Sequence, residues 1–320
     1  MKCAEAEEFP VKQIQRFRGC LLGLAVGDAV GTTLEFKPPG SFKPISDMVG
    51  GGPFRLKPGE WTDDTSMALC LAHSLLEKNG FDPKDQMDRY CRWWKEGYLS
   101  SNGRCFDIGN TVAEALRRYQ KTGDPIAGST SPHSAGNGCI MRLAPVPMFY
   151  FNDPEEAIEK SAKSSTTTHG AAACLDAGRY LAALLIGALS GSSKEEILSS
   201  RFTLVPGYWD QKPLVYEIDE IACGSFKHKN PPQIQGTGYV LRSLEAALWS
   251  FYKTDSFQPA ILKAANLGDD ADTTAAICGQ LAGAFYGEFG IPKNWLEKLA
   301  MRQEITNLAE SLLAANPRAQ

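Results

Sequence analysis

The sequence contains few histidines and no run of basic residues. Its 320 residues include only four histidines, and 33 scattered lysines and arginines are outnumbered by 37 acidic residues, which gives a formal net charge of −4. Proteins that bind nucleic acid usually present a concentrated basic face. We therefore expect no nucleic-acid partner.

Cysteine pairs of the C-x-x-C type are also absent. The nine cysteines are widely spaced and odd in number, which argues against a disulfide framework or a zinc knuckle and indicates reduced thiols. No apolar run reaches the ~18 residues that a membrane span needs. The acidic start, MKCAEAEEFP, lacks the apolar segment of a signal peptide. The prediction is a cytoplasmic protein with no transmembrane segment.

Strong β-strand patterns are rare, whereas helical periodicity covers most of the chain. Residues 203–209 and the stretch around Ile45 are weak strand candidates, and proline and glycine interrupt both. No segment rich in Gly, Ser or Pro divides the chain, so we predict a single all-α domain, a compact multi-helix bundle over residues 1–320. Apolar periodicity predicts helices over residues 13–30, 65–78, 84–98, 109–121, 154–165, 170–190, 237–253, 256–266, 273–287 and 294–314.

Two of these predicted helices carry glycine at every fourth position. The segments are RGCLLGLAVGDAVG, residues 18–31, and CGQLAGAFYG, residues 278–287. Four-residue spacing puts the glycines on one helix face, where the bare backbone allows another helix to approach closely. Each glycine costs about 1 kcal/mol relative to alanine inside a helix, so we expect close helix packing to offset that cost.

The first of two acidic clusters is WTDDT, residues 61–65. Thr62 is a suitable N-cap for the helix that follows. Asp63 and Asp64 would occupy the first turn, where the helix dipole favours anions. Taken alone, this cluster is equally consistent with helix capping and with a functional site.

The second acidic cluster is GDDADTT, residues 268–274. On a regular helix Asp270 and Asp272 would point about 200° apart, because successive residues turn by about 100°. They can converge only if a turn, which Gly268 favours, precedes a helix that begins near Thr273. Three carboxylates in one turn also exceed what helix capping requires.

Both clusters place acids and a threonine at the start of a helix rich in small residues. If the fold brings the two helix starts together, four or five carboxylates converge and need cations to neutralise them. Carboxylate and hydroxyl oxygens select hard cations such as Mg²⁺, Mn²⁺ or Ca²⁺. This much charge fits two ions better than one, and a two-metal site can orient a diol or activate a water molecule.

Four further stretches place polar residues beside predicted helices. Glu35 follows the first glycine-faced helix, and on its own it is more typical of a solvated loop. Asp107 in CFDIGNT is first a candidate helix cap. The G-N-G sequence at residues 136–138 precedes an apolar helix and could bind phosphate, although it is more often a plain turn. His169 is equally a candidate cap and a candidate ligand contact.

Together these segments resemble the ADP-ribosylglycohydrolase family. The resemblance extends over nearly the whole chain, in order, through RGCLLGLAVGDAVGTTLEF, WTDDTSMAL, CFDIGNT, AGNGCIMRLAPV, TTHG and NLGDDADTTAAICGQLAGAFYG. The paired acidic motifs are its most specific part, and the form is closest to bacterial enzymes that act on ADP-ribosyl-arginine. The resemblance implies an all-helical orthogonal bundle, two Mg²⁺ or Mn²⁺ ions, an ADP-ribosylated protein as substrate and ADP-ribose as product.

The resemblance also implies roles for particular residues. The metal ligands would be Thr62, Asp63, Asp64, Asp270, Asp272 and Thr273. Contacts to the ADP-ribosyl group would come from Asp107, Gly109, Ser134, Gly136, Asn137, Gly138, His169 and Asp269. Asp107 would lie near the guanidinium, Asp63 or Glu35 would help to activate water, and the bond from C1″ to the arginine nitrogen would break through an oxocarbenium-like transition state.

Other interpretations share the fold. One is the hydrolysis of serine-linked ADP-ribose, O-acetyl-ADP-ribose or poly(ADP-ribose), against which Asp107 favours arginine. Another is an immunity protein that binds and blocks an ADP-ribosylating toxin, for which the short leader MKCAEAEEFPVKQI offers little surface. A degenerate structural relative would not need the acids that both clusters retain.

Overall fold

The computed structural model describes residues 9–315. This part of the chain forms α-helices and no β-sheet, which confirms the all-α prediction. The α-helices are α1 Phe9–Gly31, α2 Asp63–Lys78, α3 Pro83–Glu96, α4 Asn110–Thr122, α5 Pro145–Phe149, α6 Pro154–Thr166, α7 Ala172–Ser190, α8 Lys194–Ile197, α9 Tyr208–Gln211, α10 Tyr216–Ala222, α11 Val240–Tyr252, α12 Phe257–Ala265, α13 Ala271–Tyr286, α14 Lys293–Lys298 and α15 Arg302–Ala315. Short 3₁₀ turns are η1 Thr32–Leu34, η2 Pro132–Ser134, η3 Ser225–Lys227 and η4 Glu288–Gly290.

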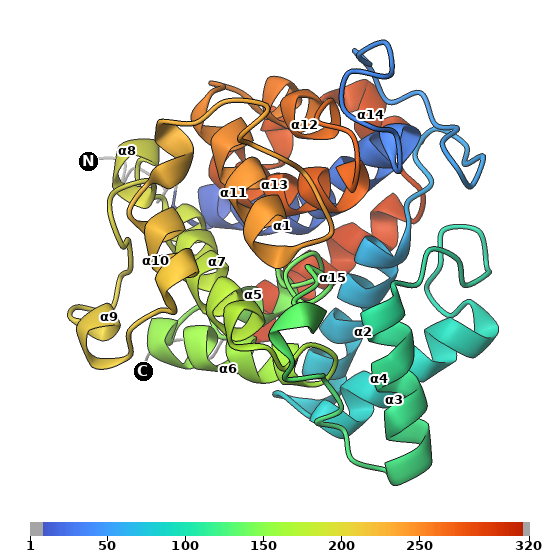
Figure 1. Cartoon of the computed structure of the whole chain (residues 1–320), viewed down its shortest axis with the longest axis vertical. Coiled ribbons are helices and arrows are strands. Elements are labelled where there is room, and N and C mark those ends of the chain that lie inside the picture. Colours follow the sequence, from blue (N-terminus) through green and yellow to red (C-terminus); the bar gives the residue numbers. More distant parts are fainter. Residues whose placement is uncertain (1–8, 316–320) are drawn as a thin grey trace, which may run out of the picture.

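The centre of the molecule is the antiparallel pair of α1 and α13, which share the most extensive helix contact in the described chain (Figure 1). The four-residue spacing predicted a close approach by another helix, and the structure shows that the two glycine faces meet each other. A Cβ added to Gly23 would lie 2.3 Å from the carbonyl oxygen of Gly279, and one added to Gly31 would lie 2.3 Å from that of Ala271. Only glycine permits such a close approach, and this packing brings the end of α1 beside the start of α13.

Two groups of apolar side chains form the core. The larger surrounds the central pair and includes Phe17, Trp61 and Trp295, all fully buried. The smaller fills the space between α2, α3 and α4 with residues such as Tyr90 and Leu116. These three helices stand together on one side of the molecule (Figure 1), and α2 contributes residues to both groups.

Helix α7 is the one described helix that is long and apolar enough to cross a membrane by length and composition. In this fold 78% of its apolar window is buried within the protein. Its two charged residues also pair with each other, because Arg179 Nη1 donates to Asp176 Oδ1 at 2.7 Å. The burial is that of a core helix.

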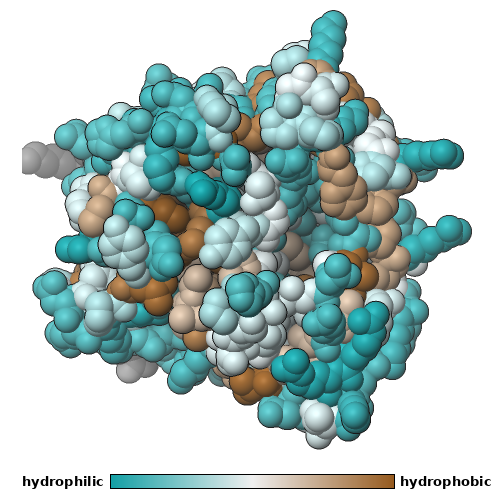
Figure 2. Space-filling view, viewed as in Figure 1, coloured by the Kyte–Doolittle hydropathy of each residue, from teal (hydrophilic) through white to brown (hydrophobic). Residues whose placement is uncertain are grey.

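The face of the molecule shown in Figure 2 is mostly hydrophilic. On the face shown in Figure 2 the apolar residues form small separate groups among polar and charged ones. The cysteines of the described residues are all free, and Cys3 lies outside the described residues.

Nine of the ten predicted helices correspond to observed ones, and the tenth was wrong. The pattern over residues 294–314 divides into α14 and α15. The break is tertiary in origin: the amide of Ala300 donates to the Gly59 carbonyl oxygen at 2.9 Å, and the Trp61 indole donates to the Ala300 carbonyl oxygen at 3.2 Å. Met301 takes a positive φ of 52° at the same point.

Both strand candidates were also wrong. Residues 203–207 form a loop, and residues 208 and 209 begin α9. The backbone of Ile45 makes a strand-like pair of hydrogen bonds, but its partner is the side-chain amide of Asn266, at 2.8 and 3.0 Å. The apolar helix expected directly after residues 136–138 is replaced by turns, and α5 begins only at Pro145. The short helices α5, α8, α9 and α10 were not predicted.

Candidate active site

The two acidic clusters meet because α1 and α13 run antiparallel. The chain that leaves α1 lies against the turn before α13, since the Phe36 amide donates to the Asp269 carbonyl oxygen at 2.7 Å and the Asp269 amide donates to that of Lys37 at 2.8 Å. This turn has a positive φ at Gly268 (75°) and at Asp269 (53°). The predicted turn is present, although α13 already begins at Ala271, earlier than expected.

Asp28, a residue outside the predicted site, holds the start of α2 against α1. The backbone amide and hydroxyl of Thr62 donate to Asp28 Oδ1 at 2.8 and 2.9 Å. The same two groups of Thr65 donate to Asp28 Oδ2 at 3.0 and 2.6 Å. Thr62 occupies the N-cap position of α2 but makes no side-chain capping bond. A carboxylate inside a glycine-faced helix was the available signal for Asp28.

Five buried or partly buried carboxyl groups gather at the junction of these segments. Asp28, Asp64 and Asp272 each offer an oxygen within 4.8 Å of the others, and so do Glu35, Asp107 and Asp272. Asp272 therefore belongs to both groups. One oxygen each of Asp64 and Asp272 is buried without a hydrogen-bond partner.

Two threonines lie among these acids. The hydroxyl oxygen of Thr62 is 3.2 Å from both Asp64 Oδ2 and Asp272 Oδ2. Thr273 donates its hydroxyl to Asp64 Oδ2 at 3.4 Å. The predicted metal-ligand residues of the two clusters are thus neighbours in space.

This carboxylate cluster contains no cationic side chain. None of the ion pairs within residues 9–315 includes any of its five acids. Burial raises the pKa of Asp28 to about 6, of Asp107 to about 7 and of Glu35 to about 10. Burial and neighbouring acids raise the pKa of Asp64 and Asp272 well above the ordinary value. Oxygen donors with unpaired lone pairs and no internal counter-charge fit a hard divalent cation.

The cluster opens into a cavity of about 370 Å³. Eleven predicted site residues line this cavity: Glu35, Asp63, Asp107, Gly109, Gly136, Asn137, Gly138, His169, Asp270, Asp272 and Thr273. Thr62 and Asp64 lie behind the wall, within the cluster. Ser134 and Asp269 are not part of the wall: the Ser134 carbonyl oxygen accepts from the Gly136 amide at 2.9 Å, and Asp269 holds the loop after α1.

A loop before α11 joins the two sides of the cavity, and no pattern in the sequence pointed to this role. The Asn137 amide donates to the carbonyl oxygen of Gly238 at 3.1 Å, and the Asp270 amide donates to that of Gly236 at 2.8 Å. Asn137 Nδ2 also donates to Asp270 Oδ2 at 2.8 Å. The G-N-G turn and the second acidic cluster are therefore fixed to each other.

His169 and Asp107 face the cavity and do not cap helices. The N-cap of α7 is Ala171, and that of α4 is Gly109. Burial lowers the pKa of His169 to about 3, so its ring is neutral near pH 7. A Cβ added to Gly138 would lie 2.8 Å from the Cε1 atom of that ring, so the glycine is needed for the close approach.

The all-helical fold and the carboxylate cluster that opens into a cavity are the features that the resemblance to the ADP-ribosylglycohydrolase family implied. The chain belongs to the ADP-ribosylglycohydrolase family, whose model matches residues 10–320.

Similar proteins agree with this assignment. The chain is 45% identical over 306 residues to the ADP-ribosylarginine hydrolase Tri1 of Serratia proteamaculans. The aligned residues cover 96% of this chain and 81% of that protein. It is 34% identical over 312 residues to the ADP-ribosyl dinitrogen reductase glycohydrolase of Rhodospirillum rubrum, covering 93% and 96%. A solved structure described as an ADP-ribosylglycohydrolase-related protein complex superposes with a TM-score of 0.83 at 43% identity, covering 95% and 99%.

Proposed function

We propose that this protein hydrolyses the N-glycosidic bond between ADP-ribose and an arginine side chain of a modified protein, with the help of divalent cations. Similarity to the two relatives named for arginine and dinitrogen reductase supports the substrate. The observation that carries the proposal is Asp272, which belongs to both carboxylate groups, lines the cavity and keeps one buried oxygen unpaired.

Two Mg²⁺ or Mn²⁺ ions would neutralise the carboxylate cluster. The residues that would hold them are Thr62, Asp63, Asp64, Asp270, Asp272 and Thr273. Bound there, the ions would supply Lewis-acid polarisation and orient the hydroxyls of the substrate ribose. Asp28 would position the ligand residues and would not bind an ion itself, because both of its oxygens already accept hydrogen bonds from Thr62 and Thr65.

The carboxyl groups that line the cavity would accept and donate the protons that move during the reaction. Hydrolysis places the hydroxyl of water on C1″ and returns a proton to the leaving guanidine nitrogen. Glu35 and Asp63 line the cavity, and in the ionised form that bound cations would favour they would accept the proton of the attacking water. Asp107 would contact the departing guanidine group.

A side-by-side assay of two linkages tests the proposal. Peptides that carry ADP-ribose on arginine or on serine are incubated with the enzyme in Mg²⁺, in Mn²⁺ or in EDTA, and free ADP-ribose is measured by chromatography. We expect release from the arginine peptide in either metal and none in EDTA. Release only from serine, or full activity in EDTA, would contradict the proposal.

A matched pair of variants gives the control. Asp107→Asn should slow release from arginine. Asp82→Asn should not, since Asp82 caps α3 by accepting from the Lys84 and Asp85 amides and asparagine caps helices equally well.

A further inference from the structure

Arg142 is a buried cation without an anionic partner. Its side chain is 1% exposed, and no ion pair among residues 9–315 includes it. The guanidinium lies 4.8 Å from the ring centre of Tyr90, Nη1 is 3.8 Å from the sulfur of Met67, and Nε has no partner. A buried charge without a counter-charge costs several kcal/mol, so its retention requires a compensating interaction elsewhere.

The one strong hydrogen bond of Arg142 leads to His169. Arg142 Nη2 donates to the hydroxyl oxygen of Thr168 at 2.6 Å, and that oxygen is 2.9 Å from His169 Nδ1. A guanidinium can only donate, so the threonine oxygen accepts from it and keeps its own hydrogen for Nδ1. The opposite arrangement, in which Nδ1 donates, would leave the Thr168 hydroxyl hydrogen with no acceptor among the described residues.

The direction of these bonds fixes the tautomer of His169. A neutral imidazole carries one proton, and an accepting Nδ1 places that proton on Nε2. Nε2 lies at the cavity wall, 3.2 Å from where a Cβ would stand on either Gly136 or Gly138. His169 is 2% exposed, and no hydrogen bond within the described chain uses Nε2. A buried donor is therefore directed into the cavity.

Other neutral donors surround the same part of the cavity. Asn110, Thr111 and Val112 line it, and they form the first turn of α4, whose amides have no acceptor within the helix. The amide of Gly138, also on the wall, has no recorded acceptor among the described residues. No lysine or arginine lines the cavity. The part of the cavity between His169 and the start of α4 therefore suits an anion that is held by neutral donors.

We propose that Arg142 and Thr168 are positioning residues that hold His169 as an Nε2–H donor to the diphosphate of the ADP-ribosyl group. This inference rests on the proposed function for the identity of the ligand. Arg142 lies outside the cavity and acts through the hydroxyl of Thr168. Its unscreened charge lies behind the donor and favours a negative ligand in front of it.

The tautomer is tested first, without any ligand. Protein labelled with ¹⁵N-histidine at neutral pH should give for His169 the nitrogen shifts of a neutral Nε2–H ring, with the signal assigned from its loss in His169→Gln. Thr168→Val, which removes the hydroxyl but keeps the shape, should move His169 toward the Nδ1–H form. A protonated or Nδ1–H ring in the wild type would overturn the proposal.

The affinity for ADP-ribose is tested second, by calorimetry in Mg²⁺. Thr168→Val should bind about ten- to a hundred-fold more weakly, as expected for the loss of a hydrogen bond to a charged group, and Thr168→Ser should restore binding. Arg142→Lys, which removes the guanidinium that donates to Thr168, should bind ADP-ribose more weakly than the wild type, and melting temperatures show that each variant is folded. Equal affinity of Thr168→Val and Thr168→Ser would refute the relay.

The two proposals fail in different ways. A wild-type protein that binds no ADP-ribose would refute the proposed function and, with it, the diphosphate as ligand. A wild-type protein that binds ADP-ribose, combined with a Thr168→Val variant of unchanged tautomer and affinity, would refute only the roles of Arg142 and Thr168.

Discussion

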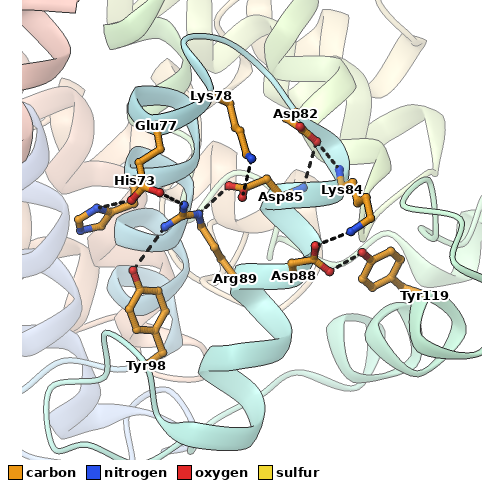
Figure 3. A network of polar contacts seen from close by, with 10 residues as sticks. All are labelled: His73, Glu77, Lys78, Asp82, Lys84, Asp85, Asp88, Arg89, Tyr98 and Tyr119. Carbon is orange, nitrogen blue, oxygen red and sulfur yellow. Dashed lines mark hydrogen bonds and ion pairs between the residues drawn. The ribbon is translucent and has the colours of Figure 1, made fainter.

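Helix α2 has acidic residues at both ends, but the acids at its C-terminal end pair with cations and those at its N-terminal end do not. At the C-terminal end Arg89 donates to Glu77 Oε2 at 2.5 Å and to Asp85 Oδ2 at 2.6 Å, and Lys78 is 3.6 Å from Asp85. Figure 3 shows this network of α2 and α3, in which each acid faces a cation, a backbone amide or a hydroxyl. At the N-terminal end the carboxyl groups face one another.

The pKa values of the acids follow this difference. The hydrogen bond from Arg89 lowers the pKa of Glu77, and for Asp85 the hydrogen bonds from Arg89 and Ser74 outweigh burial and lower the pKa as well. Burial raises the pKa of Asp63 and Asp64 far above the ordinary value, and neighbouring acids add to it. Acids that are compensated within the protein stabilise the fold, whereas uncompensated ones create a demand for a cation from outside.

Asp272→Ala should have the largest effect. Loss of the residue shared by both carboxylate groups should reduce turnover on the order of a thousand-fold, because Lewis-acid stabilisation contributes several kcal/mol and each 1.36 kcal/mol is about tenfold in rate. The melting temperature in EDTA should not fall, since a repelling charge has been removed. Steady-state kinetics and thermal melts check both, and Asp88→Ala in the paired network is the control. Wild-type turnover in Mg²⁺ would refute the two-cluster site.

Arg89→Met should affect stability and leave the chemistry unchanged. It removes the cation shared by Glu77 and Asp85, whose side chains are 58% and 18% exposed. Breaking a buried pair costs about 3 to 5 kcal/mol, and solvent screening of Glu77 reduces this to about 2 to 3 kcal/mol. Urea unfolding measures the loss, which Mg²⁺ should not restore. A normal unfolding free energy would show that the network is dispensable.

The metal-free protein should lose stability as the pH rises from about 4 to about 7. Asp28 and Asp107 have folded pKa values raised from 3.8 to about 6 and about 7. In this window the folded state binds more protons than the unfolded state, so raising the pH removes stability until the folded pKa is passed. Glu77 and Asp85 have lowered pKa values and act in the opposite sense. The stability that they contribute is lost when the pH falls and they become protonated.

Thermal melts across this pH range, with and without Mg²⁺, distinguish the two ends of α2. The melting temperature in EDTA should decrease by a few degrees toward neutral pH, and Mg²⁺ should abolish that decrease because it stabilises the ionised acids. A melting temperature in EDTA that is flat or rises toward neutral pH would contradict the raised pKa values.

Lys84→Ala should have the smallest effect. Lys84 Nζ lies 2.8 Å from Asp88 Oδ2, but the two side chains are 70% and 49% exposed. Exposed pairs contribute little because water screens them, so we expect a urea unfolding curve that cannot be distinguished from that of the wild type. A measurable loss would mean that the exposed part of the network in Figure 3 is cooperative with Arg89.

Much of the site was predictable because its residues are grouped in short segments. The two acidic clusters and the G-N-G turn each place several wall residues together, and eleven predicted residues line the cavity. Ser134 and Asp269 were included because the family resemblance implied them, yet they lie off the wall because neighbours in sequence need not face the same way. Asp28 and Arg142 were missed, since a single charged residue in an apolar segment is only a weak signal.

The sequence by itself predicted the long helices up to residue 287, a close approach by another helix on each of the two glycine faces, and a density of acids that favours cations. These follow from periodicity, from glycine spacing and from the density of acids, all of which are local properties. The tertiary structure decided which acids share a centre, where the helix between residues 294 and 314 breaks, and which nitrogen of His169 faces the cavity. Those outcomes depend on contacts such as that between Thr62 and Asp272, 210 positions apart, which only the packing of the whole chain can specify.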